Sequence, residues 1–296
     1  MQDYDIFVDA AADIDPAFTS QSPIHFVWMS YTMDEENCIC QGLEDENWLK
    51  SFYDAQRSGT VTRTSQATPQ QYIDAFSASM AKGRDILYLS LSGELTNTRD
   101  SLRLAEPELK ELFPDCTIRA VDSLSATGGI GLLAEAACEN KKKGWSLEAN
   151  AKDLEAMRSR ICHLFMVDDL MYLKRGGRIP AATAVIGTAL NIHPILIIDQ
   201  AGALVIIEKK RGDKLSLREL ISIFEEVHDT QENRLYVIHA DAPDRAADLC
   251  DAIRKTAPAS EISTCMLTPI IGAHTGPGMC AITFIGNREK LKNREG

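Results

Sequence analysis

Residues 85–98 read Asp85-Ile-Leu-Tyr-Leu-Ser-Leu-Ser-Gly-Glu-Leu-Thr-Asn-Thr98, an apolar strand that leads through a short polar turn into a helical pattern. Strands that alternate with helices in this way build parallel sheets. Three further strands are expected before residue 125, at 5–9, 24–29 and 117–122. Helical patterns lie near 45–56, 69–82, 97–112 and 126–143. This half is therefore predicted to be a mostly parallel sheet covered by helices on both faces.

The second half of the chain has a different pattern. A strand at 161–167 is followed by two closely spaced strands, 193–199 and 203–209, which flank the hairpin-type turn Gln200-Ala-Gly202. Helices at 215–229 and 244–256 alternate with strands at 235–240, 261–267 and 279–285, and Pro180 can open a short helix. We expect an α/β domain at 1–155, an α+β domain with a mixed or antiparallel sheet at 156–296, and a ligand cleft at their junction.

Composition narrows the class of protein. The 296 residues are 45% hydrophobic and 25% charged, and their net charge of −12 argues against nucleic-acid binding. The beginning of the chain lacks the pattern of a secretory signal, and no apolar run approaches the ~18 residues of a membrane span. Eight scattered cysteines without a Cys-x-x-Cys pair are interpreted as reduced structural thiols, not metal ligands. A cytoplasmic protein without a metal or cofactor is expected.

Hydroxyl-rich turns follow several of the expected strands. The carboxyl ends of parallel strands meet at one edge of a sheet, which would bring Asp9, the turn 90–98 and Asp122-Ser123 together. Thr64-Ser65-Gln66 adds hydroxyls just before a helix. Free backbone N–H groups and a helix dipole at such turns favour a phosphate, sulfate or carboxylate. The glycines of Gly128-Gly129-Ile-Gly131 do not form a nucleotide-binding fingerprint, and helix–strand packing explains them as well.

Two further residues leave alternatives open. His274 lies in a glycine- and proline-rich turn expected over 271–279, where it could contact a ligand or belong to a purely structural turn. Arg178 follows Gly176-Gly177 and could clamp an anion or act as a strut between the domains. The residues alone do not decide between these roles.

Taken together, these segments resemble the DegV family over nearly the whole chain. The landmarks, in order, are Asp9, Thr64-Ser65-Gln66, the turn 90–98, Val121-Asp122-Ser123, Leu170 to Ile179, His193-Pro194 and His274 to Gly278. Members of this family bind fatty acids and include the fatty-acid-binding subunits of bacterial fatty acid kinase. The resemblance implies a two-domain DegV-like (EDD) fold, of the kind shared with dihydroxyacetone kinase and a sugar phosphotransferase domain.

The resemblance also implies which residues hold a ligand. A long acyl chain would lie in an apolar tunnel, and its carboxylate would be held by Thr64 and Thr96, together with Asn97 and His274. The supporting residues would be Ser65, Ser92, Ser123, Arg178, Arg211 and Gly276.

Four positions depart from the usual family pattern. Thr96 replaces Ser and Asn97 replaces Gly, which Asn tolerates because it accepts left-handed backbone geometry. Arg99 replaces an aromatic residue, and Ala10 stands where Ser is usual.

The function expected from these features is that of a non-catalytic carrier. It would present a long-chain fatty acid, about C14 to C18, to the catalytic subunit of a fatty acid kinase for acyl phosphate formation. Arg178 and Arg211 are candidates for contacts with the partner, a membrane surface or the head group. The alternative is an enzyme or phosphotransfer protein that acts on a small phosphorylated or carboxylated metabolite, with His274 as its acid/base.

Overall fold

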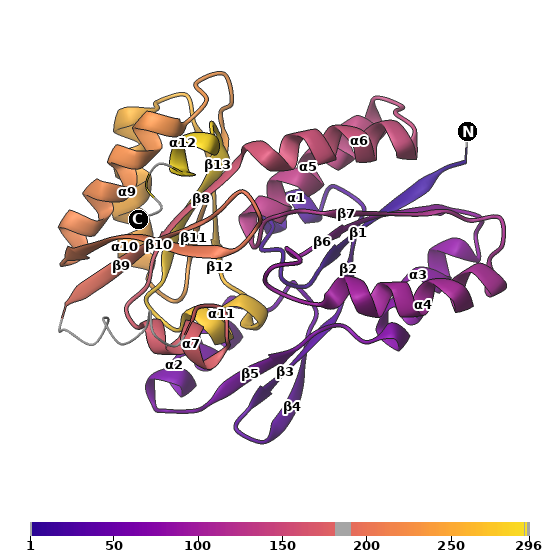
Figure 1. The fold of residues 1–296 in the computed structure, drawn as a ribbon, viewed down its shortest axis with the longest axis horizontal. Helices are drawn as coiled ribbons and strands as arrows, with labels where there is room; N and C mark the ends of the chain where they lie inside the picture. The colour runs from indigo at the N-terminus through magenta and orange to yellow at the C-terminus, as the bar shows by residue number, and fades with distance from the viewer. Residues whose placement is uncertain (1, 181–190, 293, 295–296) are drawn as a thin grey trace.

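The computed structural model describes residues 2–180, 191–292 and 294, and its first sheet is parallel with the strand order β2-β1-β6-β7 (Figure 1). The strands are β1 (Tyr4–Asp9), β2 (Ile24–Val27), β6 (Asp85–Ser90) and β7 (Ile118–Asp122). All residues of β1 and β6 are buried, because α3 (Pro69–Met80) and α4 (Thr98–Leu112) cover one face and α5 (Gly128–Lys142) and α6 (Leu147–Met157) cover the other. The predicted parallel sheet is confirmed.

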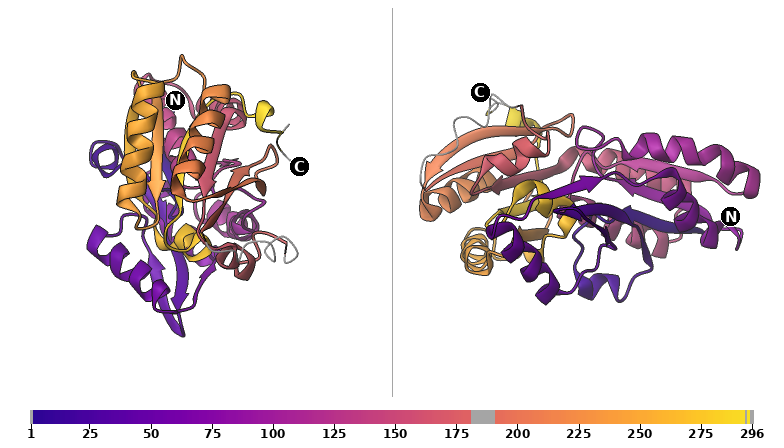
Figure 2. Two further views of the ribbon diagram at one scale, coloured as in Figure 1. Left: turned by 90° about the vertical axis from the view of Figure 1, so that its left-hand side faces the viewer. Right: turned by 90° about the horizontal axis from the view of Figure 1, so that it is seen from below.

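The second sheet is mixed and has the strand order β10-β9-β8-β13-β11-β12. Its strands are β8 (Ile161–Met166), β9 (Ile192–Ile198), β10 (Leu204–Arg211), β11 (Arg234–His239), β12 (Glu261–Met266) and β13 (Cys280–Ile285). Only β11 and β12 pair in parallel; the other neighbours are antiparallel. The amphipathic helices α9 (Asp213–Val227) and α10 (Pro243–Thr256) cover one face (Figure 2). The other face packs toward the first half of the chain, and the predicted mixed sheet is confirmed.

A small third sheet, β4-β3-β5, was not expected from the sequence. It consists of β3 (Met29–Met33), β4 (Glu36–Cys40) and β5 (Thr62–Ser65), all antiparallel. The single strand expected over 24–29 is therefore two strands, which separate at the exposed Trp28. The hydroxyl-rich segment around Thr64 forms a strand of this sheet, β5, and it precedes α3 as expected.

Short helices complete the described chain. They are α1 (Pro16–Thr19), α2 (Glu46–Arg57), the 3-10 turn η1 (Arg158–Arg160), α7 (Leu170–Arg175), α11 (Pro269–Thr275) and α12 (Glu289–Lys292). The helix expected after Pro180 would fall in 181–190, which lies outside the described residues. Among the helices described, none combines the length and apolar character that crossing a membrane requires.

Helix α5 is shared by the two large sheets. It contacts β1 and β6 of the first sheet and β8, β11 and β13 of the second. A Cβ on Gly128 would come within 2.7 Å of the Tyr236 side chain, and one on Gly129 within 2.4 Å of His163 Nε2. These glycines therefore allow the helix to lie directly against the second sheet, which confirms the packing interpretation of Gly128-Gly129-Ile-Gly131.

Buried polar contacts fasten the two halves together. The fully buried Arg288 donates to the Leu124 carbonyl at 3.0 Å and to the Asp199 carbonyl. The Tyr53 hydroxyl donates to the Leu267 carbonyl at 2.9 Å. Helix α6 ends at Met157 and β8 begins at Ile161, and the division of the chain at residue 155 stays a prediction.

Asp13 links the loop after β1 to the start of α11. Its Oδ1 accepts the Thr268 N–H at 2.8 Å, and its side chain is buried. Its Oδ2 has no hydrogen-bond partner among the described residues. Burial raises the pKa of Asp13 to about 8, although the Thr268 hydrogen bond opposes this rise. The folded chain therefore favours the protonated carboxyl group.

We predict that Asp13→Asn flattens the dependence of stability on pH. The pKa of Asp13 in the folded state lies above its pKa in the unfolded chain. At pH values between these two pKa values, the folded state therefore binds more protons than the unfolded state. The free energy of unfolding should therefore fall as pH rises, by roughly 2–4 kcal/mol between about pH 5 and 8, from this residue alone. Urea denaturation at both pH values should show a smaller fall for Asp13→Asn. The exposed Asp248→Asn serves as control, and equal slopes in wild type and Asp13→Asn would contradict the prediction.

Candidate functional site

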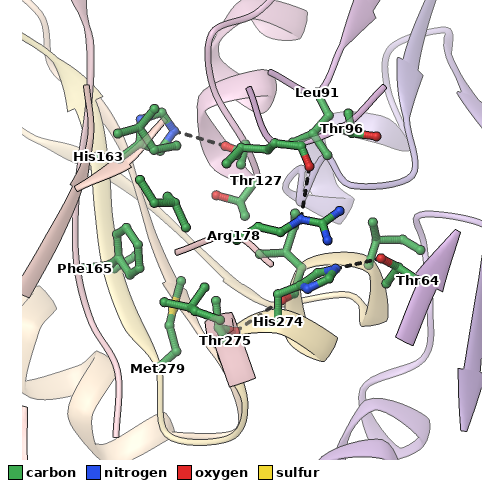
Figure 3. A pocket seen from close by; sticks show the side chains of 18 of the residues that line it. Thr64, Leu91, Thr96, Thr127, His163, Phe165, Arg178, His274, Thr275 and Met279 are labelled. Atoms are coloured by element: carbon green, nitrogen blue, oxygen red, sulfur yellow. Dashed lines mark hydrogen bonds between the residues drawn. The ribbon is translucent and has the colours of Figure 1, made fainter. Parts of the chain in front are cut away.

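A largely apolar cavity lies at the seam between the two large sheets and the small one. It holds about 730 Å³ of empty space, including the part of its mouth that is open to solvent. Its apolar wall includes Leu91, Leu95, Phe165, Ile198, Leu204 and Met279. Its polar lining includes Thr64, Ser65, Gln66, Thr96, Arg178 and His274, and Figure 3 labels Thr64, Thr96, Arg178 and His274 among them. We call these six residues the polar rim.

Two rim residues from distant parts of the chain are hydrogen-bonded to each other. Thr64 on β5 and His274 on the last turn of α11 meet with 2.7 Å between Oγ1 and Nε2. The turn expected over 271–279 is thus partly wrong, because Pro269 opens a helix that continues to Thr275. A Cβ on Gly176 would lie 2.0 Å from His274 Nδ1. The absence of a side chain at Gly176 therefore makes room for the imidazole ring.

His274 is neutral at physiological pH. Burial, and then the charge of Arg178, lower the pKa of His274 to about 3. A neutral ring can still donate one N–H or accept one hydrogen bond. The low pKa disfavours His274 as a proton donor near neutral pH, as the acid/base alternative would require.

Arg178 brings a positive charge to the rim. Its Nε donates to the Leu95 carbonyl at 3.1 Å, and Nη1 donates to the Gly176 carbonyl. Burial lowers the pKa of Arg178, and among the described residues no carboxylate forms an ion pair with it. Arg178 thus joins the two halves of the chain as a strut, and its charge has no carboxylate counterion among the described residues.

The buried carboxyl group of Asp9 holds the start of the turn 91–98 in place. Asp9 at the end of β1 accepts the Leu91 N–H at 2.7 Å and the Tyr88 hydroxyl at 2.5 Å. Burial raises the pKa of Asp9 to about 6, although both hydrogen bonds oppose the rise. Thr96 then faces the cavity, and its hydroxyl makes no hydrogen bond with a described residue.

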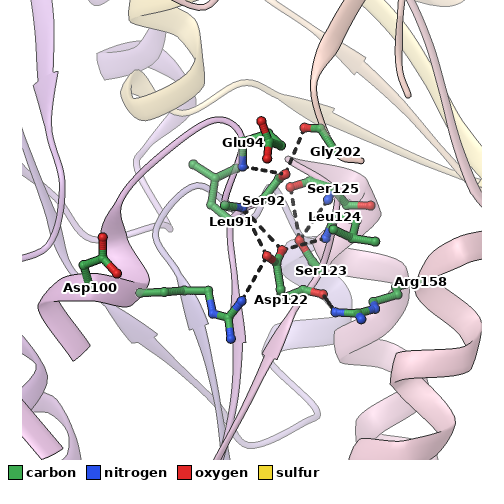
Figure 4. A network of polar contacts seen from close by, with 12 residues as sticks. Leu91, Ser92, Glu94, Asp100, Asp122, Ser123, Leu124, Ser125, Arg158 and Gly202 are labelled. Carbon is green, nitrogen blue, oxygen red and sulfur yellow. Dashed lines mark hydrogen bonds and ion pairs between the residues drawn. The ribbon is translucent and has the colours of Figure 1, made fainter. Parts of the chain in front are cut away.

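Several expected site residues have structural partners instead of lining the cavity. The Ser92 hydroxyl donates to the Gly202 carbonyl at 2.9 Å, and the Ser123 hydroxyl donates to the Ser125 carbonyl at 3.1 Å (Figure 4). The Asp122 carboxylate accepts a hydrogen bond from the Arg99 guanidinium at 3.2 Å. This contact gives a structural reason for arginine at a position where the family usually has an aromatic residue. These contacts fasten the turns beneath the cavity to one another and to the second sheet.

The remaining expected residues are placed as follows. Asn97 is exposed with a φ of −94°, so the left-handed geometry expected there is wrong. Gly276 ends α11 with a φ of 70°, and its close approach to the Tyr172 ring leaves no room for a side chain. Arg211 is exposed at the end of β10, outside the described lining. The ligand-binding roles of all these residues stay predictions.

The polar lining residues that sequence reasoning did not assign to the site include Thr127 and His163. Thr127 precedes the glycines of α5, and this position next to a helix start was the available signal. His163 lies in a buried apolar strand, where a structural histidine is the usual interpretation. Within the described part of the chain, no group of three or more His, Cys, Asp or Glu side chains is arranged to hold a metal ion.

Comparison with known proteins agrees with this architecture. The family model described as "Uncharacterised protein, DegV family" matches residues 3–287. A DegV domain-containing protein of Clostridium perfringens is 34% identical over 291 residues, which cover 98% of this chain and 100% of that protein. The chain therefore belongs to the DegV family.

Solved structures share the fold. A DegV lipid-binding protein from Thermotoga maritima has a TM-score of 0.85 at 26% identity, and the match covers 96% of this chain and 99% of that one. The fatty acid kinase B3 protein of Streptococcus pneumoniae, solved with linoleic acid, has a TM-score of 0.84 over the same shares. Its identity of 19% shows likeness of fold alone. The predicted fold class is confirmed.

We predict that Arg178→Gln raises the pKa of His274. Removing the cation removes one of the two causes of the low value, but burial, the larger cause, remains. The pKa should therefore rise and stay below its ordinary value of 6.5. Nitrogen-resolved NMR of the imidazole between about pH 3.5 and 7 measures this. Arg175→Gln, an exposed charge change on α7, should leave the titration unchanged. Titration of wild-type His274 near its ordinary value would contradict the assignment.

Proposed function

We propose that this chain binds a long-chain fatty acid, about C14 to C18, in the seam cavity. The carboxylate would lie at the polar rim beside Thr64, Thr96, Arg178 and His274, and the acyl chain would extend along the apolar wall toward Phe165. The observation that carries this proposal is Arg178, a half-buried cation that has no carboxylate partner among the described residues. A monovalent anion attached to an apolar chain complements both parts of the cavity.

The energetics favour a lipid over a small polar metabolite. Burying about 14 methylenes at ~0.8 kcal/mol each gives a gross ~11 kcal/mol, before the costs of ordering the chain. A buried carboxylate also needs several donors, because an unpaired charge away from water is costly. Two threonine hydroxyls, the neutral imidazole and the guanidinium can supply them. A small phosphorylated metabolite would leave the apolar wall without a partner.

The similar proteins support this proposal. One structural neighbour is described as lipid-binding, and another was solved with linoleic acid as a fatty acid kinase protein. We infer that this chain is a carrier and not a catalyst, and that it presents the bound carboxylate to a separate kinase subunit. The carboxylate oxygen would attack the γ-phosphorus of ATP on that subunit, giving an acyl phosphate and ADP. The exposed Arg211 is available for contact with the partner or, transiently, with a membrane surface.

We predict that Arg178→Gln weakens the binding of oleate about tenfold or more. The substitution removes a charge-assisted contact to the carboxylate while the apolar wall stays intact. Isothermal titration of delipidated protein with oleate measures the change. Arg175→Gln loses the same charge on the adjacent helix and should bind as wild type does.

Two results would contradict this assignment. One is wild-type protein that binds no oleate and releases no fatty acid to mass spectrometry after denaturation. The other is equal affinity of Arg178→Gln and wild type, which would place the carboxylate away from Arg178.

The partner is tested separately. Oleate-loaded protein incubated with ATP and the catalytic subunit of a bacterial fatty acid kinase should yield oleoyl phosphate, trapped as the hydroxamate. Free oleate at the same concentration, without this chain, is the control and should give far less product. Equal product with and without the loaded chain would contradict the carrier role and leave fatty-acid binding standing.

A further inference from the structure

A second polar spot lies in the wall of the seam cavity, apart from the Thr64–His274 pair of the rim. Thr127 and His163 both line the cavity and are each only 4% exposed (Figure 3). Resting on the proposed function, we propose that this spot recognises an oxygen substituent on the acyl chain. The ligand class would then be a hydroxy or oxo fatty acid.

Thr127 has a side chain that is only 4% exposed and a hydroxyl that pairs with none of the other described residues. It occupies the N-cap position of the 15-residue helix α5, yet its side chain makes no capping hydrogen bond. Its hydroxyl also bonds to none of the other described residues, and its side chain faces the cavity (Figure 3). A ligand that fills the cavity would exclude water from this hydroxyl, and a hydroxyl left unpaired away from water costs free energy. An oxygen atom on a ligand would supply the missing partner.

The backbone at Thr127 is also unusual. Its φ of 50° and ψ of −129° are rarely adopted by a β-branched residue. Such strained geometry is found where the surrounding structure fixes it, often beside a ligand. The conformation places Thr127 at the positive end of the α5 dipole, where the N–H groups of Gly129 and Ile130 already donate to the Ala126 and Thr127 carbonyls. This environment favours an oxygen over a methylene.

His163 on β8 stands beside Thr127. Its Nε2 lies 3.1 Å from the carbonyl of Ala126, the residue before Thr127, so the ring is fastened to the same turn. Its Nδ1 has no hydrogen-bond partner among the described residues. Gly129 leaves the space that the ring occupies, since a Cβ there would lie 2.4 Å from Nε2. The imidazole and the hydroxyl thus form one polar spot held in place by α5 and β8.

The polar spot predicts a specific selectivity. In a wholly apolar tunnel, a hydroxyl on the acyl chain would lose its hydrogen bonds to water and weaken binding about tenfold or more. At the matching carbon atom, Thr127 would restore a hydrogen bond, and the penalty would disappear. An unsubstituted acyl chain would also bind, and the Thr127 hydroxyl would then stay unpaired.

The test compares octadecanoic acid with a positional series of hydroxyoctadecanoic acids by competition binding. In wild type, at least one mid-chain isomer should bind as tightly as octadecanoic acid or more tightly. The isosteric Thr127→Val should weaken binding of that isomer about tenfold and leave octadecanoic acid within about twofold. Thr127→Ser keeps the hydroxyl and should retain the preference.

Two results would overturn the inference while leaving fatty-acid binding intact. One is wild-type protein that binds every hydroxy isomer at least tenfold more weakly than octadecanoic acid, a result that needs no variant to fold. The other is an equal loss for both ligands in Thr127→Val. Failure of wild type to bind octadecanoic acid itself would instead overturn the proposed function, and this inference with it.

Discussion

The close approach of α5 to the second sheet is the constraint on which the rest of the structure depends. Side chains at Gly128 and Gly129 would collide with Tyr236 and His163. The helix can therefore pack against both sheets only because these two residues have no side chain. Strands of both large sheets therefore contact the same helix, and the seam between the two halves of the chain lies beside it. The cavity lies in this seam, and its wall includes residues from both halves of the chain.

The polar side chains around the seam are of two kinds. Some have hydrogen-bond partners within the protein, and others have none among the described residues. Asp9, Ser92 and Ser123 have partners within the protein and hold the turns in place. Within the described part of the chain, Arg178 has no carboxylate partner and the Thr127 hydroxyl has no hydrogen-bond partner, and both residues line the same apolar cavity. Because buried polar groups are normally paired, the residues left unsatisfied indicate where a ligand's polar atoms would lie.

The sequence predicted the two large sheets because their strands are apolar, well separated and punctuated by clear helix and turn signals. It did not predict the third sheet, whose short strands are half exposed and carry polar residues such as those of Thr62–Ser65. It placed His274 in a turn because the glycines after Thr275 obscured the helix that Pro269 opens. The Thr64–His274 contact spans 210 residues, and no local pattern encodes such a pairing. The resemblance to a family, and not periodicity, brought those two residues together.

A fatty acid bound as proposed would have both of its ends in one cavity, in a defined orientation. A crystal structure of the protein with bound oleate tests it most directly. We expect continuous density in the seam, with the carboxylate within hydrogen-bond distance of Thr64 or Arg178 and the methyl end beyond Phe165. An empty seam with oleate bound elsewhere, or a chain whose carboxylate lies at the far end from Arg178, would contradict it.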